Sequence, residues 1–282
     1  MLIKENKLSF QPFAAARLID THAHLNFSAY KDDADKVIRR SLDNDVWLIN
    51  AGSQYSTSKR AVEIVERYEK GVYAAVGLHP IYASEQSEGL RREHGSLRIQ
   101  DGFQYKKYKE LAESKKVVAI GEIGLDYKSE YVAFKQEQKE VFLEQLDLAR
   151  ELDLPIIFHC RMAHQDLLKI IDSGLKGVIH CFTGTWAEAQ KYIDMGFSLG
   201  FNGIIFRLNL DEIIKKTPLE RILIETDCPF LTPSPKEGRN EPLYVKYVAE
   251  KIAKIKGLSY KEISRITTEN ARKLFKIKEE KL

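Results

Sequence analysis

Short apolar runs alternate along the chain with longer amphipathic segments, and this alternation is the main structural signal in the sequence. The runs are rich in Val, Ile and Leu and are bounded by Pro, Gly or charged residues, which is typical of parallel strands covered on both faces. We expect a buried strand at each of eight positions: 17–20, 46–50, 72–77, 117–121, 155–158, 177–179, 197–201 and 222–226.

The segments between these runs carry apolar residues at three- and four-residue spacing, which is the pattern of amphipathic helices. Clear examples are 59–70, 134–153, 164–174 and 186–196. Eight alternations of strand and helix predict an α/β fold of the (β/α)8 TIM-barrel type, which commonly has about this length as one domain. A doubly wound open sheet is the alternative, but no glycine-rich phosphate loop follows the first run.

We expect the barrel to occupy residues 17–282 as a single domain, preceded by an N-terminal extension over 1–16. No low-complexity linker, short repeat or break in composition divides this region. The longest irregular stretch, from Tyr82 to about Asp101, follows the third run. In a barrel it would therefore overhang the face where the loops after the strands build active sites.

Residues of metal-ligand type lie at or just past the ends of five of the eight runs. The C-terminal ends of parallel barrel strands share one face, so we expect these side chains to converge there. His22 and His24 are two residues apart, and such side chains point the same way, about 6 to 7 Å apart along a strand. One such residue alone would be weak evidence, because buried His and Glu often serve structure. The other members of the set are Glu122, His159, His180 and Asp227.

Imidazole and carboxylate ligands together suit zinc, manganese, magnesium or other divalent ions. A glutamate such as Glu122 can bridge two ions, and a two-metal site can activate water and hold phosphoryl oxygens. Asp227, at the exit of the last run, is placed to ligate a metal and to accept the proton of the attacking water. Among the other three runs, only His79 in the segment GLHP follows as a ligand type, and its proline indicates a turn role.

Composition and cysteine content indicate a cytoplasmic protein without a membrane span. The net charge of +3 is only mildly basic, so any contact with nucleic acid would have to come from local clusters of charge. No window approaches the roughly 18 apolar residues that a membrane helix needs. Three cysteines form an odd count, which fits a reducing cytosol. Cys160, Cys181 and Cys228 each follow a proposed ligand, so strand alternation predicts that they face the helix layer.

The ordered motifs DTHAHL, GLHP, GEIGLDY, HCR, HCFTG and ETDCPFLTP resemble the TatD family of metal-dependent deoxyribonucleases, within the amidohydrolase-like barrels. The resemblance extends from about residue 18 to residue 275. It implies a (β/α)8 barrel, two or more divalent ions, and hydrolysis of phosphodiester bonds in DNA, usually as a 3′ to 5′ exonuclease. It also implies two ligand sets, with the first ion held by His22, His24, Glu122 and Asp227, and the second by Glu122, His159 and His180.

Two arginines are candidates for binding substrate phosphates, namely Arg161 in HCR and Arg207 in NGIIFR. A planar guanidinium pairs bidentately with phosphate oxygens, although a surface ion pair is the simpler explanation for each. DNA is therefore the expected partner, and nothing in the sequence indicates a membrane contact or an obligate protein partner. The stretches 1–16 and about 82–108 depart from the family pattern, so substrate choice stays open.

Two other functions compete with a nuclease. One is a small-molecule hydrolase of the same superfamily that cleaves an ester, amide or lactone. Relatives of that kind often have a carboxylated lysine as the bridging ligand at the fourth strand, where this chain has Glu122. The other is a metal-binding scaffold without catalysis, which would have no need for a proton acceptor such as Asp227 beside an open metal position.

Overall fold

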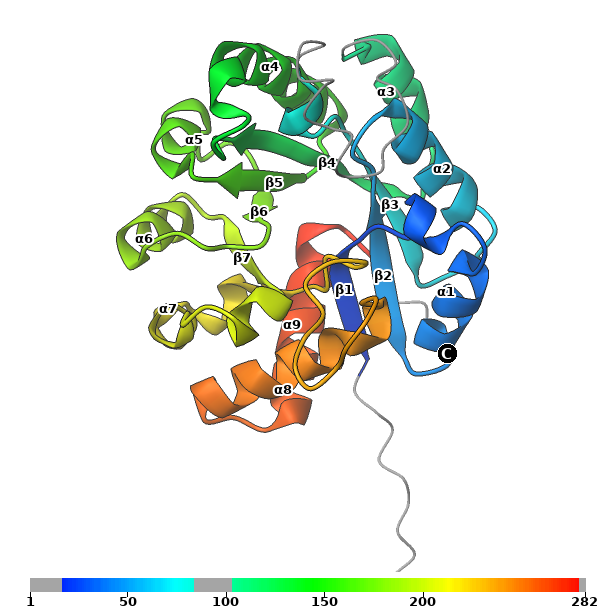
Figure 1. Ribbon diagram of the computed structural model, residues 1–282, viewed down its shortest axis with the longest axis vertical. Helices are drawn as coiled ribbons and strands as arrows, with labels where there is room; N and C mark the ends of the chain where they lie inside the picture. Colours follow the sequence, from blue (N-terminus) through cyan, green and yellow to red (C-terminus); the bar gives the residue numbers. More distant parts are fainter. Residues whose placement is uncertain (1–16, 84–102, 279–282) are drawn as a thin grey trace, which may run out of the picture.

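The computed structural model describes residues 17–83 and 103–278. Eight parallel strands pair in chain order from β1 to β8, and the helices cover the outside of the barrel that they form (Figure 1). The predicted (β/α)8 fold is thus confirmed. The predicted extension over 1–16 and most of the 82–108 stretch lie outside the described residues. The strands are β1 (Leu18–Ala23), β2 (Val46–Ala51), β3 (Val72–Val76), β4 (Val117–Asp126), β5 (Ile156–Arg161), β6 (Gly177–Ile179), β7 (Ser198–Phe201) and β8 (Ile222–Ile224).

The helices begin and end with local signals that the sequence carries. At the start of the last helix, Ser259 accepts a hydrogen bond from the Glu262 backbone N–H, while the Glu262 carboxylate accepts one from the Ser259 backbone. Within the described residues no helix is long and apolar enough to cross a membrane. The helices are α1 (Ala34–Leu42), α2 (Tyr55–Val65), α3 (Tyr105–Ala112), α4 (Lys135–Leu152), α5 (His164–Ile170), α6 (Trp186–Asp194), α7 (Asp211–Lys216), α8 (Val245–Lys256) and α9 (Tyr260–Leu274).

Alternation along the strands divides the core into two layers. On β5, Ile157 belongs to the cluster inside the barrel, whereas Ile156 and Phe158 pack outward against the helices. Phe275, just after α9, joins the inner cluster. The side chain of Thr268 in α9 donates a hydrogen bond to the Arg17 carbonyl, so this helix lies at the N-terminal end of β1. Apolar packing therefore fills that end, and the opposite end is left for polar side chains.

The barrel closes where β8 meets β1, at the end that carries the polar side chains. Beyond β8, the Asp227 N–H donates to the His22 carbonyl at 2.8 Å, and the His24 N–H donates to the Cys228 carbonyl at 2.9 Å. The buried carboxylate of Asp20 accepts hydrogen bonds from the backbone N–H and the hydroxyl of Thr226. These bonds hold His22, His24 and Asp227 side by side, although the chain separates them by about two hundred residues.

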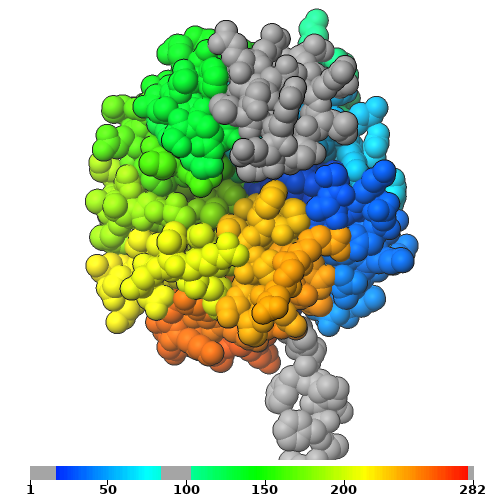
Figure 2. Space-filling view, in the orientation of Figure 1, coloured from blue at the N-terminus to red at the C-terminus, as the bar shows by residue number. Residues whose placement is uncertain are grey.

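Three of the strands continue well beyond their predicted apolar runs: β1 extends to Ala23, β4 to Asp126 and β5 to Arg161. β4 and β5 stay paired to the residue pair Asp126 and Arg161, after a shift in register between Ile120 and Ile123. Glu122 therefore lies inside a strand and not at its exit, because backbone pairing continues through polar residues. Figure 2 shows the face of the molecule at the C-terminal ends of the strands, where the loops after the strands surround a recess.

Gly124, between Glu122 and Asp126 on β4, provides a test of this packing. Its φ is +143°, and a Cβ at this position would lie 2.0 Å from the His159 carbonyl oxygen. Gly124→Ala should therefore lower the free energy of unfolding by about 3 kcal/mol, measured by urea denaturation. Gly196→Ala is the control, because its φ is +94° but nothing lies within 4 Å, and it should lose only about 1 kcal/mol. Equal losses would contradict the close approach of β4 and β5.

Candidate metal centre

All six side chains predicted as metal ligands gather at the C-terminal end of the barrel. They converge because every strand runs in the same direction and ends on this face. Their nitrogen and oxygen atoms form overlapping groups whose members lie within 4.8 Å of one another. His22 lies in β1 and His24 directly after it, Glu122 in β4, His159 in β5, His180 directly after β6, and Asp227 just beyond β8.

A first group surrounds the facing nitrogens of His22 and His24. The two Nε2 atoms lie 3.0 Å apart. Asp227 Oδ1 lies 3.3 Å from His24 Nε2, and Glu122 Oε2 lies 3.3 Å from His22 Nε2. The nitrogens of His22 and His24 and an oxygen of Asp227 therefore form one compact group, and Glu122 Oε2 lies beside His22 at its edge. Imidazole and carboxylate donors of this kind suit a divalent cation.

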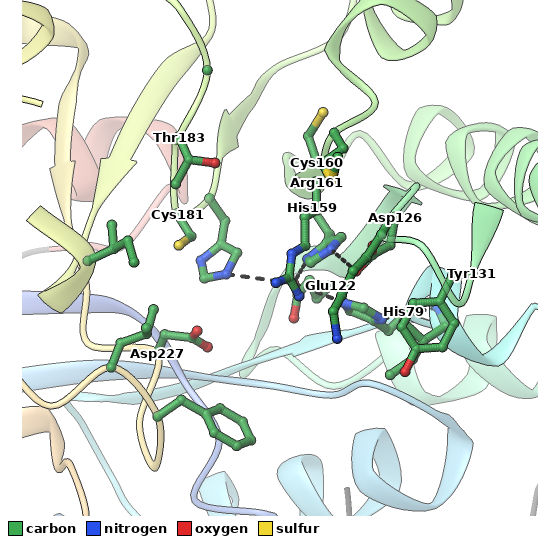
Figure 3. A pocket seen from close by; sticks show the side chains of 18 of the residues that line it. His79, Glu122, Asp126, Tyr131, His159, Cys160, Arg161, Cys181, Thr183 and Asp227 are labelled. Atoms are coloured by element: carbon green, nitrogen blue, oxygen red, sulfur yellow. Dashed lines mark hydrogen bonds and ion pairs between the residues drawn. The ribbon is translucent and has the colours of Figure 1, made fainter. Parts of the chain in front are cut away.

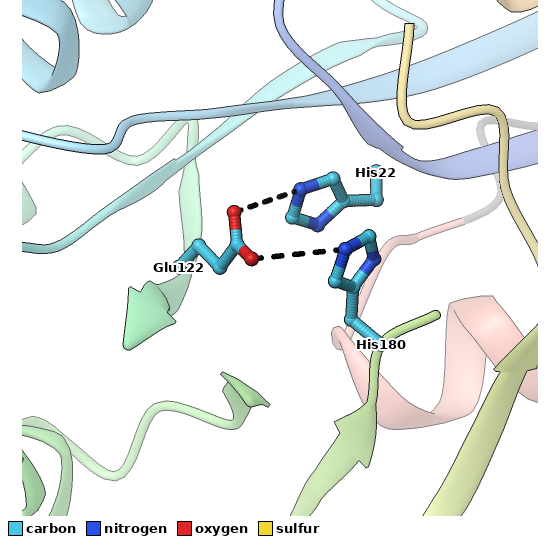
Figure 4. Close-up of side chains that lie close together, drawn as sticks. All are labelled: His22, Glu122 and His180. Carbon is cyan, nitrogen blue, oxygen red and sulfur yellow. Dashed lines mark ion pairs between the residues drawn. The ribbon is translucent and has the colours of Figure 1, made fainter. Parts of the chain in front are cut away.

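A second group surrounds the other oxygen of Glu122. His159 Nδ1 lies 2.7 Å and His180 Nε2 lies 3.7 Å from Glu122 Oε1. Figure 4 shows His22 and His180 facing the two oxygens of Glu122, with their rings stacked at a centroid distance of 3.7 Å. Glu122 therefore presents one oxygen to each group, as a carboxylate that bridges two ions does.

His79 is a further member of this cluster that the sequence did not assign to it. Its Nε2 lies 3.4 Å from Glu122 Oε1, and its ring packs edge-on against His159. Its Nδ1 accepts a hydrogen bond from the Ile81 backbone N–H and caps the short 3-10 helix Pro80–Tyr82. His79 does have the turn role that the proline indicated, but this role uses only its Nδ1 and leaves Nε2 to face Glu122. The sequence signal that could have placed His79 in the cluster was its position directly after the third run.

Two buried carboxylates outside the predicted set support the histidines. Asp126 Oδ2 lies 3.0 Å from His159 Nε2, and Glu225 Oε1 lies 2.8 Å from His180 Nδ1. Gly200 leaves room for Glu225, since a Cβ there would lie 2.5 Å from Glu225 Oε2. Such carboxylates orient a metal-binding imidazole and increase its basicity. The sequence carried a signal for both residues, because side chains an even number of positions apart on a strand share a face. Asp126 follows Glu122 along the same strand, and Glu225 precedes Asp227 by two residues.

The charges of this cluster are balanced internally. Burial by itself would lower the pKa of His159, but its hydrogen bonds to Asp126 and Glu122 outweigh burial and raise the pKa to about 9. Burial likewise opposes the charge on His180, but the negative charges of Glu225 and Glu122 raise its pKa to about 10. Burial opposes the charge of Glu122, but the neighbouring imidazoles, His79 first and then His22 and His180, hold its pKa well below its usual range. A divalent cation bound here would replace the protons on the His159 and His180 rings and supply the positive charge in their place. The residues present therefore fit a metal.

The cysteines follow the predicted arrangement only in part. Cys160 and Cys228 pack into the outer hydrophobic layer, as strand alternation predicts, although Cys160 also borders the pocket described below, whereas Cys181 belongs to neither hydrophobic cluster. Cys181 instead lines the pocket, so the prediction that it faces the helix layer was wrong. β6 ends at Ile179 and Cys181 has a φ of +46°, so strand alternation no longer applies there.

A pocket of about 660 Å³ opens above the cluster. Figure 3 shows the side chains of Glu122, His159, Arg161 and Asp227 around this pocket. Arg161 is exposed and lines this pocket, since it lies on the same face of β5 as His159. Arg207 is exposed as well, but it is not among the lining residues. The structure therefore brings one of the two candidate arginines to the cluster.

A (β/α)8 barrel whose C-terminal face carries clustered imidazoles and carboxylates is the architecture of metal-dependent hydrolases. The family model described as TatD related DNase matches residues 19–276. The chain belongs to this family and is a metal-dependent hydrolase within it.

Similar proteins cover nearly the whole chain. An uncharacterized metal-dependent hydrolase, YabD of Bacillus subtilis, is 44% identical over 269 residues, which are 92% of this chain and 99% of YabD. A protein of Pantoea ananatis named 3′-5′ ssDNA/RNA exonuclease TatD is 34% identical over 272 residues, with 92% and 99% covered. Among solved structures, the TatD homologue YjjV of Escherichia coli has a TM-score of 0.77 at 27% identity, with 93% and 99% of the two chains covered.

The position of Glu122 between the two groups predicts that its loss affects all bound metal. Glu122→Ala should reduce metal content, measured by elemental analysis, and should remove most of the increase in melting temperature that added Mn²⁺ gives the unaltered protein. Glu151→Gln is the control, because Glu151 is an exposed carboxylate that pairs with Lys109 on the surface. Full metal content in Glu122→Ala, together with an unchanged thermal response, would show that Glu122 is not a ligand.

Proposed function

We propose that this protein is a metal-dependent deoxyribonuclease that removes nucleotides from the 3′ end of a DNA strand. The observation that carries the proposal is the position of Glu122, which presents its two oxygens to two separate groups of imidazoles beneath an open pocket. Membership of the family of TatD related DNases supports it, as do relatives named 3′-5′ ssDNA/RNA exonuclease.

The proposed ligands divide into two sets that share Glu122. His22, His24, Glu122 and Asp227 would hold one cation, and Glu122, His159 and His180 would hold a second, to which His79 would contribute because its Nε2 lies 3.4 Å from Glu122 Oε1. Cations at these positions would lower the pKa of a water molecule and stabilise negative charge on the phosphoryl oxygens.

Asp227 is the side chain that we assign to proton transfer. Burial would raise its pKa, but the hydrogen bond from His24 and the charge of His180 outweigh burial and lower it, so the carboxylate is ionised at neutral pH. Its side chain is 16% exposed, compared with 5% for Glu122, so it is the more accessible carboxylate to a water in the pocket. When that water attacks phosphorus, Asp227 accepts its proton, and the bond from phosphorus to the 3′ oxygen of the preceding nucleotide breaks.

Arg161 is the residue that we assign to phosphate binding. It is charged, exposed and directed to the pocket by the same strand face that presents His159. Within residues 17–83 and 103–278, the side chain of Arg161 forms no ion pair. Its guanidinium is therefore available to a phosphate of the strand, and its planar shape suits bidentate pairing.

One assay tests the proposal. Single-stranded and duplex DNA labelled at the 5′ end would be incubated with the protein and each of Mg²⁺, Mn²⁺ and Zn²⁺. The expected result is stepwise shortening from the 3′ end with release of mononucleotides, and loss of this activity after chelation. Absence of DNA cleavage with every metal, combined with hydrolysis of a small ester, amide or lactone, would favour the alternative hydrolase.

Asp227→Asn preserves size and one coordinating oxygen but removes the proton acceptor. We expect turnover on DNA to fall by roughly 10² to 10⁴ while metal stays bound. Single-turnover kinetics and elemental analysis on the same sample measure the two properties separately. Normal turnover in this variant would exclude Asp227 as the base, and loss of metal would restrict its role to that of a ligand.

Arg161→Ala should weaken DNA binding through loss of one phosphate contact. Its Michaelis constant for DNA should rise, and the slope of log affinity against log salt concentration should become shallower by about one unit. Arg207→Ala is the matched comparison, and its effect should be smaller because Arg207 lies outside the pocket lining. An unchanged salt slope in Arg161→Ala would contradict its assignment.

A further inference from the structure

Exposed apolar side chains gather at the mouth of the pocket. Six large hydrophobic side chains of the described residues are exposed, and three of them line this one pocket. They are Met162, Leu208 and Phe230, which are 74%, 45% and 49% exposed. Clustered apolar surface around a polar site marks the place where an apolar part of a ligand binds.

The ring of Phe230 is held beside the proposed metal ligands. Its backbone N–H donates to the Asp227 carbonyl at 3.0 Å, and its own carbonyl accepts from the Asn240 side chain at 2.6 Å. Its ring lies 6.4 Å from that of Phe27, at an angle of 69°, and Phe27 stacks on His24 at 4.3 Å. The loop is thus tethered on both sides of a half-exposed aromatic ring.

Further apolar side chains extend the pocket lining beyond this aromatic pair. Met162 directly follows β5, while Ile204 and Leu208 lie in and after the 3-10 helix Gly203–Phe206. A thioether and aliphatic groups at a pocket that also presents an aromatic ring suit a flat, polarisable ligand. The floor beneath them carries the carboxylates, imidazoles and Arg161, which suit a phosphate. A nucleotide has both parts, joined through its sugar.

We propose that Phe230, supported by Phe27 in the same pocket that Met162 and Leu208 line, forms a subsite that stacks on the terminal nucleobase of the strand. This inference rests on the proposed nuclease function and names what the pocket recognises besides phosphate. Stacking accepts every base because every base has a π-face, so the subsite favours an unpaired end without selecting its sequence. A base in a duplex has to leave its partner first, so a paired end binds more weakly.

Binding of a 3′-terminal 2-aminopurine oligonucleotide tests the subsite without turnover. The experiment uses the Asp227→Asn background, and the fluorescence of the modified base should be quenched when it stacks. Phe230→Ala should weaken binding by about 5- to 100-fold and reduce the quenching. Phe230→Tyr keeps the aromatic face and should restore both. Leu143→Ala is the matched control, because Leu143 on α4 is 48% exposed but does not line the pocket.

A second oligonucleotide, which lacks only its terminal base, separates stacking from general damage. The parent should bind it about 5- to 100-fold more weakly than the intact strand, whereas Phe230→Ala should bind both alike. If the Asp227→Asn parent binds DNA without distinguishing the two strands, and the unaltered protein cleaves DNA, the subsite is excluded and the nuclease function stands. If the Asp227→Asn parent binds neither strand and the unaltered protein cleaves no DNA, the proposed function fails, and the subsite fails with it.

Discussion

The buried carboxylate of Glu122 is the group on which the rest of the site depends. Ionised carboxylates are costly to bury unless opposite charges and hydrogen bonds compensate them. Glu122 is compensated by imidazoles at 2.7 to 3.7 Å, contributed by segments that follow or belong to different strands of the barrel. Two of those histidines, His159 and His180, are in turn held by Asp126 and Glu225. A cation that enters this cluster replaces protons and needs little rearrangement of the protein.

The barrel provides the rigidity that such a cluster requires. Apolar side chains fill the interior and the N-terminal end of the barrel, so the polar residues at the C-terminal end rest on a packed hydrophobic core. Backbone hydrogen bonds between the end of β1 and the segment after β8 fix His22, His24 and Asp227 relative to one another. These contacts fix the relative positions of the polar side chains, and charge that is preorganised in this way favours catalysis.

The pocket combines two kinds of surface at different depths. Charged and imidazole groups form its floor, and apolar side chains such as Phe230 and Met162 stand at its mouth. A polymer with charged phosphates and flat bases matches this order of surfaces. A small ester or lactone would use the floor but would leave the exposed apolar groups without a partner.

The sequence by itself determined the barrel and the gathering of six polar side chains, because both follow from local patterns. Strand alternation and helical periodicity repeat within each unit, and the C-terminal ends of parallel strands must meet. Whether the six side chains bind metal stays a prediction. The sequence could not determine which groups pair across the barrel, since pairing depends on register between strands far apart in the chain. Only the tertiary structure showed that His79 lies beside Glu122 and that Glu225 lies beside His180. It also distinguished the two candidate arginines, because Arg161 lines the pocket and Arg207 does not. It also turned Cys181 toward the pocket, because β6 ends before that residue and its backbone leaves the strand conformation.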